Sequence, residues 1–222
     1  MTRILTALVV IVFLLATVTC ASWNPRQRGE MIGGVGGAVV GGVIGHAAGS
    51  TVLGAIIGAA VGGAAGAIIG SYMDKQAAEM QRDLEGAEIQ RIGEGIKITF
   101  DSGILFDIDK SDLRPVSETN LAKLAKILNK YPDTNILIEG HTDDTGTEDH
   151  NMALSKDRAQ SVSQYLATVE VKSSRFSIAG YGETQPIVTN DSPEGRQKNR
   201  RVDIAVMAND KLKKAAQEKA KG

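Results

Sequence analysis

The stretch NILIEGHTDDTGTEDHNMALSKDRAQSV (residues 135–162) decides the fold of this chain. Residues 135–139 have the composition of a buried strand, and a polar turn follows them. Apolar residues then recur at helical spacing from about Asn151 to Thr168. The residues expected to face inward from this helix are Leu154, Val162 and Leu166. A strand that returns through a helix is a unit of a mixed α/β domain.

The same alternation of strands and helices continues on both sides of this stretch. Pro115 suits the first turn of a helix that is expected to run to about Lys130. Strands are expected at 96–100, 135–139, 176–180 and 202–206. The order β-α-β-α-β-loop-β predicts an α+β fold, a two-layer βαβαββ domain over residues 91–208.

The first thirty residues have the layout of a secretory signal followed by a tether. A basic start, an apolar run from Ile4 to Ala16 and small residues lead to Cys20, the single cysteine. This arrangement resembles a bacterial lipoprotein signal, which predicts a signal peptide at 1–19 and lipidation of Cys20. Thr19 departs from that pattern, so an uncleaved anchor helix or ordinary signal cleavage are the alternatives. Residues 20–30 are expected to form the lipidated tether. By the same resemblance, the presence of Ala21 rather than aspartate after the cysteine implies the outer membrane.

A glycine segment at 31–73 contains no charged residue and 14 of the 25 glycines. Two ladders place glycine at every fourth position, over 33–49 and over 54–70. Such a stripe allows close packing of helices in a membrane. The pattern predicts a membrane-associated glycine-zipper helical hairpin (Met31–Ala48 and Thr51–Met73), with a flexible linker as the alternative. A helical stalk is expected at 74–90 and a disordered basic tail at 209–222.

The overall composition excludes several classes of function. The 25 Lys and Arg residues balance the 26 Asp and Glu residues, so no nucleic-acid partner is expected. One cysteine excludes a disulfide framework and multi-cysteine metal sites. We expect no cofactor.

Four separated motifs carry a family resemblance. They are LFDIDKSDLRP (105–115), IEGHTDDTGTEDHNMALSKDRAQSV (138–162), GYGETQPIVTN (180–190) and NRRVDI (199–204). In this order they resemble the C-terminal domain shared by OmpA, Pal and MotB. Together with the signal and the glycine segment, the whole chain is similar to OmpA-family lipoproteins of the YiaD type.

The resemblance implies an outer-membrane lipoprotein that faces the periplasm and tethers the membrane to peptidoglycan non-covalently. The family's ligand is the diaminopimelate of the stem peptide, whose side chain ends in an ammonium and a carboxylate. By resemblance Asp143 takes the ammonium and Arg158 takes the carboxylate, a bidentate contact that lysine would not match. The other expected partners are the lipid bilayer and a second copy of the chain through the glycine zipper.

Further site residues follow from the same frames. Asn151 and Thr145 are implied to line the site, Phe106 and Asp107 to form its rim, and helix amides near Asn151 to donate to the carboxylate. The alternative to ligand binding is that Asp143 and Arg158 form only an internal ion pair. We expect Arg200 and Arg201 to form structural ion pairs, and Ser155 to brace the loop or the first helical turn.

Three competing functions are weighed against wall binding. A metalloenzyme could use His141, Asp143, Asp144 and His150, but their spacing matches no metal motif, and no enzyme activity is expected. An inner-membrane, MotB-like anchor of a larger complex would need an acidic residue in its membrane helix, and 31–73 has none. A self-assembling zipper protein with secondary wall binding is the third alternative.

Overall fold

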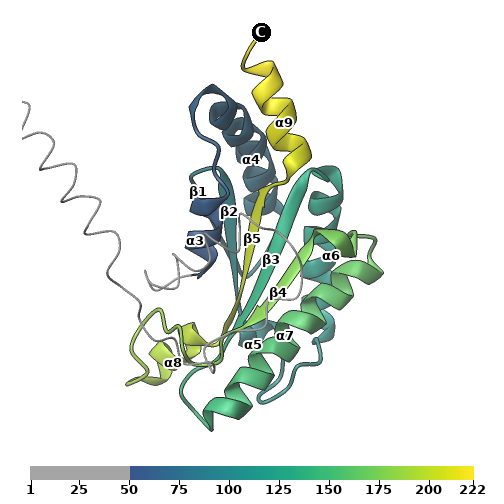
Figure 1. The fold of residues 1–222 in the computed structure, drawn as a ribbon. Coiled ribbons are helices and arrows are strands. Elements are labelled where there is room, and N and C mark those ends of the chain that lie inside the picture. Colours follow the sequence, from purple (N-terminus) through teal and green to yellow (C-terminus); the bar gives the residue numbers. More distant parts are fainter. Residues whose placement is uncertain (1–50) are drawn as a thin grey trace, which may run out of the picture.

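A five-stranded mixed sheet forms the centre of the molecule, for which a computed structural model describes residues 51–222 (Figure 1). The strands are β1 (Ala87–Ile92), β2 (Gly95–Asp101), β3 (Thr134–His141), β4 (Phe176–Gly180) and β5 (Arg201–Ala208). Their order across the sheet is β1-β2-β5-β3-β4. Only β3 and β4 run parallel, because α7 makes the crossover between them.

The helices account for the rest of the described chain. They are α3 (Thr51–Gly58), α4 (Gly63–Asp83), α5 (Ser102–Leu105), α6 (Pro115–Lys130), α7 (Glu148–Thr168), the 3-10 turn η2 (Ser173–Arg175), α8 (Pro193–Asn199) and α9 (Asp210–Lys219). Pro115 stands at the start of α6, and the four expected strands and both expected helices are present. The α+β fold class is therefore confirmed.

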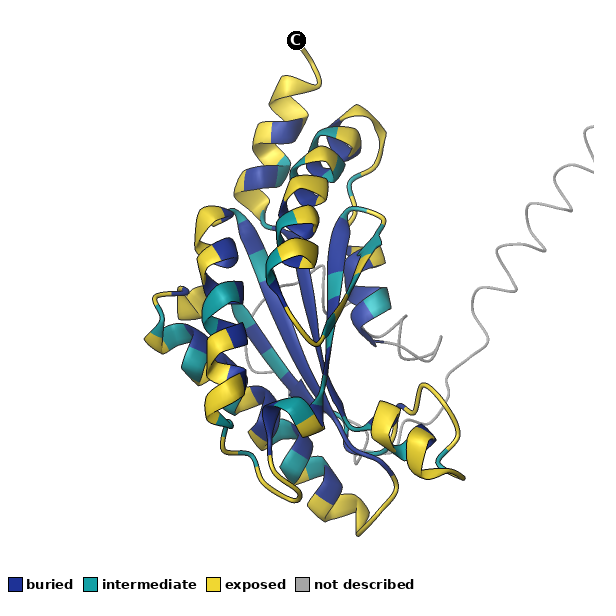
Figure 2. Ribbon diagram, turned by 180° about the vertical axis from the view of Figure 1, so that it is seen from behind, coloured by how far each residue is buried: buried dark blue, intermediate teal, exposed yellow. Residues whose placement is uncertain are grey.

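One face of the sheet carries the main core. Because side chains alternate along a strand, Ile96, Ile98 and Phe100 of β2 all point to this face, and none of them is exposed. Apolar side chains from α4, α6 and α7 join the same buried cluster. Figure 2 shows the central strands of the sheet as deeply buried, and β3 and β5 are buried along nearly their whole length.

The opposite face of the sheet is covered by α3. Val52, Ala55 and Ile56 of this helix are buried against side chains from β3 and β5. The strand residues that complete this second cluster are Leu137, Ala205 and Met207. The domain therefore has a third layer, which the two-layer prediction lacked.

The second half of the glycine segment wraps around the edge of the sheet. The single helix predicted over Thr51–Met73 is wrong, because it breaks between α3 and α4 on either face of the sheet. At the crossover Gly62 has a φ of 74°, a left-handed conformation that favours glycine. Glu94, in the turn between β1 and β2, accepts hydrogen bonds from the amides of Val61 (2.8 Å) and Gly62 (2.6 Å).

The described part of the expected membrane hairpin packs largely on the protein's own sheet, through apolar side chains of residues 51–73 that belong to the two buried clusters. Within 51–222 no helix combines the length and the hydropathy that crossing a bilayer requires. The signal peptide, Cys20, the tether and the first zipper helix lie outside the described residues.

The helical stalk predicted over 74–90 is helical only as far as Asp83. Helix α4 ends at Asp83, and residues 87–92 form strand β1. The turn at Gly93 and Glu94 folds this strand back on β2, so that Ala87 pairs with Phe100 and Ile92 with Gly95. Pairing of backbone groups with β2 outweighs the helical spacing that the sequence suggested.

The basic tail is ordered as helix α9 rather than disordered. The Asn209 side chain caps it by accepting a hydrogen bond from the amide of Leu212 (3.0 Å). Leu212 and Ala216, one turn apart, are buried in the main core cluster, next to α4. The boundaries predicted for the domain, 91–208, are therefore too narrow at both ends.

Candidate functional site

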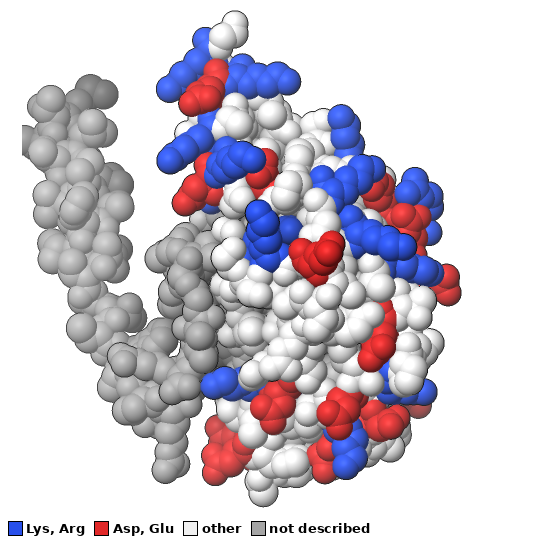
Figure 3. Space-filling view, turned by 90° about the vertical axis from the view of Figure 1, so that its right-hand side faces the viewer, with Lys and Arg blue, Asp and Glu red and all other residues white. Residues whose placement is uncertain are grey.

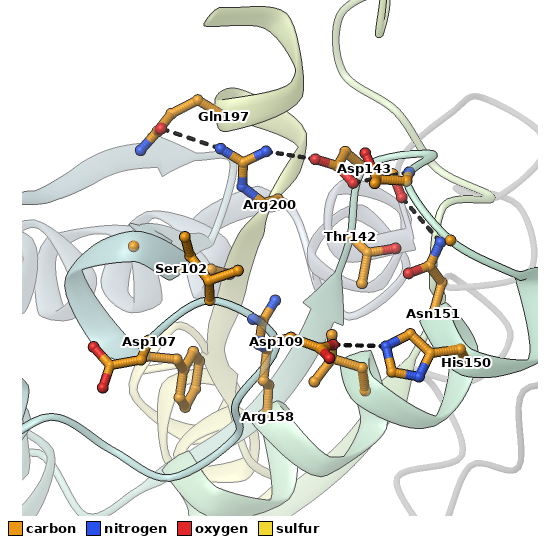
Figure 4. A pocket seen from close by; sticks show the side chains of 16 residues that line it. Ser102, Asp107, Asp109, Thr142, Asp143, His150, Asn151, Arg158, Gln197 and Arg200 are labelled. Carbon is orange, nitrogen blue, oxygen red and sulfur yellow. Dashed lines mark hydrogen bonds and ion pairs between the residues drawn. The ribbon is translucent and has the colours of Figure 1, made fainter. Parts of the chain in front are cut away.

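A pocket of about 560 Å³ opens where β3 ends and α7 begins (Figure 4). Three segments line it: α5 with the loop that follows, the turn from β3 into α7 with one side of α7, and the end of α8. All six residues predicted for the binding site line this one pocket, and three of them are charged. The six are Phe106, Asp107, Asp143, Thr145, Asn151 and Arg158.

Asp143 supplies a carboxylate at the end of β3. It is 5% exposed, and its Oδ1 accepts a hydrogen bond from the amide of Thr145 (3.0 Å). Its Oδ2 pairs with the guanidinium of Arg200. Burial alone would raise the pKa of Asp143, but the Thr145 amide and the Arg200 guanidinium outweigh it and hold the pKa below its usual range. The group is therefore an anion at neutral pH.

Arg158 presents a cation across the pocket. Its Nε donates to the carbonyl of Lys110 (2.9 Å), and its guanidinium carbon lies 5.2 Å from the centre of the Phe106 ring. Burial is the main influence on the pKa of Arg158 and lowers it, while Asp109 opposes that effect. With Nε held by the loop, the two terminal nitrogens remain for a bidentate acceptor. No ion pair joins Arg158 to Asp143 among the described residues, contrary to the alternative that the two form only an internal ion pair.

Asn151 ties the two sides of the site together. Its Nδ2 donates to the backbone carbonyl of Asp143 (3.3 Å) and to Oε2 of Glu183 (2.6 Å). Helix amides near Asn151 are expected to donate to the ligand, and α7 begins at Glu148, so the amide of Asn151 itself is not one of the open donors. That amide donates to the Thr147 carbonyl within the helix (2.9 Å).

The rim contains a pair that the sequence did not predict. Nε2 of His150, in the first turn of α7, lies 2.7 Å from Oδ1 of Asp109, in the loop after α5. Asp107, on the same loop, is paired with Arg114 at 3.5 Å. His150 had been considered only as a metal ligand. Its separation of 41 residues from Asp109 left no local signal for the pair.

Arg200 and Arg201 have different roles although they are neighbours. Arg201 is 2% exposed and pairs with Asp203 at 3.0 Å, so the structural role predicted for it is confirmed. Arg200 forms an ion pair too, but its partner is Asp143 and it lines the pocket. Adjacent residues at the start of a strand point to opposite faces, which is the signal that could have separated them. Ser155 braces a loop as expected, since its Oγ accepts from the amide of Gly182 (2.8 Å).

Helix α7 approaches the sheet closely enough to carry its side chains into the pocket. Gly140 of β3 lies directly under the backbone carbonyl of Ser155, and a Cβ at that position would overlap the carbonyl oxygen. Only glycine allows this approach. The distance between the Asp143 turn and Arg158 is therefore set by backbone contact.

A separate polar cluster is buried on the face of the sheet that α3 covers, among side chains of neighbouring strands. Glu139 and His141 of β3 are each 1% exposed, and their Oε2 and Nε2 atoms lie 3.8 Å apart. Neither side chain has a hydrogen-bond partner among the described residues. Burial is the main cause that raises the pKa of Glu139 well above its usual value, and burial lowers the pKa of His141 to about 3. The metal site considered from the sequence is thus divided, because His141 belongs to this cluster and not to the pocket.

Replacing Glu139 with Gln should change how stability depends on pH. The pKa of Glu139 is higher in the folded chain than in the unfolded one, so its favourable contribution is complete below about 4.3 and is lost as the pH rises from there. The side chain of Gln stays neutral at every pH, so its contribution to stability does not fall as the pH rises. The free energy of unfolding of Glu139→Gln should gain on the wild type by up to about 1.4 kcal/mol per pH unit over that window.

Urea unfolding at pH 4 and pH 8 measures this difference. The opposite pH effect of His141, whose contribution is lost as the pH falls below about 6.5, is common to both proteins and cancels. Glu88→Gln, on the exposed side of β1, is the matched control and should show no such trend. A constant difference at both pH values would mean that Glu139 is ionised in the fold.

The charges around the pocket define what it can bind. A carboxylate on one side and a forked cation on the other suit a small group that carries both an ammonium and a carboxylate. The rim is acidic through Asp107 and Asp109. Figure 3 shows basic side chains gathered toward the end that carries α9, and acidic side chains more numerous at the opposite end, where the pocket lies.

Comparison with known proteins gives two family matches. Residues 105–200 match the model of the OmpA family, and residues 1–74 match that of the YMGG-like Gly-zipper. The chain is 36% identical over 140 residues to the probable lipoprotein YiaD of Escherichia coli strain K12, covering 62% of this chain and 64% of that protein.

Two further relatives share the domain. Over 103 residues the chain is 41% identical to the peptidoglycan-binding protein ArfA of Mycobacterium bovis, covering 46% of this chain and 32% of ArfA. The solved cell wall anchor of the T6SS from Pseudomonas aeruginosa is 28% identical with a TM-score of 0.55, covering 62% of this chain and 97% of that one. The match thus spans less than two thirds of the length of both curated relatives.

Proposed function

Because residues 105–200 belong to the OmpA family, behind a YMGG-like glycine-zipper segment, we propose that this protein binds peptidoglycan and tethers an envelope membrane to it. The observation that carries the proposal is the presence of the Asp143 carboxylate and the Arg158 guanidinium in the lining of one pocket. The names of two relatives, a peptidoglycan-binding protein and a cell wall anchor, agree with this role. The role is that of a binding module and not of an enzyme.

The ligand in this proposal is the diaminopimelate side chain of the stem peptide. Its ammonium is placed at Asp143 and its carboxylate at the two terminal nitrogens of Arg158. Phe106 and Asp107 contact the ligand at the rim, and Asn151 and Thr145 hold the Asp143 turn in place. Arg200 now occupies Oδ2 of Asp143, so the ligand ammonium shares or replaces that contact.

The membrane side of the proposal rests on the first thirty residues. In it residues 1–19 are a signal peptide, Cys20 carries the lipid, and 20–30 form the tether to the folded part. The outer membrane is the proposed location, in keeping with the name of outer membrane porin F of Pseudomonas fluorescens, which is 41% identical over 105 residues. The name of the probable lipoprotein YiaD agrees with the proposed lipid attachment. The domain faces the periplasm in this arrangement.

Two kinds of cell wall distinguish this ligand from the glycan. The purified protein should sediment with peptidoglycan whose stem peptides contain diaminopimelate. It should stay in the supernatant with peptidoglycan that contains lysine at that position, because lysine lacks the terminal carboxylate that Arg158 would bind. Free meso-diaminopimelate should release the bound protein. Equal sedimentation with both walls would contradict the proposed ligand.

A further inference from the structure

Thr51, the first residue of α3, is hydrogen-bonded to a loop that lies 134 residues later in the chain. Its Oγ1 accepts from Nε2 of Gln185 (2.6 Å), and its amide donates to Oε1 of the same residue (3.4 Å). Thr51 is 3% exposed and Gln185 is 4% exposed, so water does not compete for these contacts.

The loop that Thr51 holds, residues 181–185, braces the pocket from behind. The carbonyl of Gly182 accepts from the amide of Thr142 (2.9 Å), the residue before Asp143. Glu183 accepts from the side chain of Asn151 (2.6 Å), which in turn donates to the Asp143 carbonyl. Both Thr142 and Asn151 line the pocket. Hydrogen bonds at both ends of this short loop therefore connect Thr51, through the covalent chain of residues 182–185, to the backbone of the Asp143 turn.

The packing of helix α3 on the sheet places Thr51 next to the 181–185 loop. Val52 and Ala55 are completely buried against the sheet, whereas Ile57 on the outer side is 66% exposed. The apolar seat fixes the helix, and the polar contacts of its first residue fix the loop. The described part of the glycine-rich segment, residues 51–73, thus has a part in shaping a site to which it contributes no lining residue.

We propose that Thr51 is a positioning residue of the peptidoglycan pocket, acting through the 181–185 loop. The inference rests on the proposed function for its ligand. Holding the loop in the free protein means that less order has to be imposed on the Asp143 turn when ligand binds. Loss of the Thr51 hydroxyl should therefore loosen the loop and weaken binding, although Thr51 does not touch the ligand.

The test compares Thr51→Val with Thr51→Ser in the full chain. Valine keeps the shape of threonine and loses the hydroxyl, while serine keeps the hydroxyl. In the ligand-free protein, amide hydrogen exchange over 181–185 should become several-fold faster in Thr51→Val. Affinity for the tripeptide L-Ala-γ-D-Glu-meso-diaminopimelate, measured by calorimetry, should fall about tenfold, which corresponds to ~1.4 kcal/mol. Thr51→Ser should restore both.

A second pair of variants tests the seat of the helix. Val52→Asp places a charge in the buried contact and should speed exchange over both 51–59 and 181–185, whereas Ile57→Asp on the exposed side should change neither. Unchanged loop exchange in Thr51→Val, or a faster loop with unchanged affinity, would overturn the positioning role. If the wild type fails to bind the tripeptide, the proposed function fails, and the exchange data still decide whether Thr51 holds the loop.

Discussion

Replacing Arg158 with lysine is expected to remove most of the affinity for diaminopimelate-containing peptidoglycan, although the positive charge is kept. Nε of Arg158 is held by the Lys110 carbonyl, and the guanidinium plane lies against Phe106, so the two terminal nitrogens point in one direction. A lysine ammonium can reproduce neither the stacking nor the bidentate geometry. Loss of one charged hydrogen bond predicts a drop in affinity of about 10- to 100-fold.

Calorimetry with the soluble tripeptide measures this drop, and circular dichroism checks that the fold persists. Asp143→Ala and Arg158→Ala should each abolish sedimentation with peptidoglycan. Arg82→Lys is the matched control, because Arg82 lies on the exposed side of α4 and pairs only with its neighbour Asp83 among the described residues. Wild-type affinity in the Arg158→Lys protein would contradict the proposed bidentate contact between Arg158 and the ligand carboxylate.

The second large effect is expected from Gly140→Ala, which should cost the fold about 3 kcal/mol or more. The added Cβ would run into the backbone carbonyl of Ser155, and backbone atoms cannot move aside as a side chain can. Relief requires α7 to move away from the sheet, and Arg158 would move with it. Urea unfolding measures the loss of stability, and the tripeptide affinity should fall in the same variant.

Gly70→Ala is the matched control for this change. Gly70 lies inside α4, and a Cβ there would have an Arg91 nitrogen as its nearest neighbour, at an ordinary 3.9 Å. Because alanine is favoured over glycine inside a helix, this variant should be more stable by roughly 0.5–1 kcal/mol. Equal stability of Gly140→Ala and the wild type would show that the close approach of α7 is not required.

The parts of the fold with a clear hydrophobic period could be predicted from the sequence. The strand at 176–180 and the helix from Pro115 to Lys130 are found with those bounds. Residues 87–92 were missed because their pairing with β2 depends on the turn at Gly93 and not on their own spacing. The ladder from Gly54 to Gly70 suggested a membrane seam, because a repeat of small residues predicts close packing without saying which surface is packed against it.

The candidate site was predictable where one motif carried both partners. Asp143 and Arg158 lie on either side of a single turn, so a strand and its returning helix bring them to one pocket. The contact between Arg200 and Asp143 joins residues 57 apart, and the sequence offered no pattern for it. The contact of Thr51 with Gln185, which are 134 residues apart, could not be predicted from the sequence for the same reason.

The entry of residue 51 beside the pocket has a mechanical consequence. If the protein is the tether proposed above, tension between the membrane and the wall enters the described domain at Thr51 and at the bound peptide. The shortest route between these points runs through Gln185, Gly182 and Thr142, and leaves most of the hydrophobic core unloaded. Under tension, the short helix on the outer face of the sheet would be peeled away one turn at a time before the strands were sheared. The grip on the wall would then weaken before the domain itself unfolded.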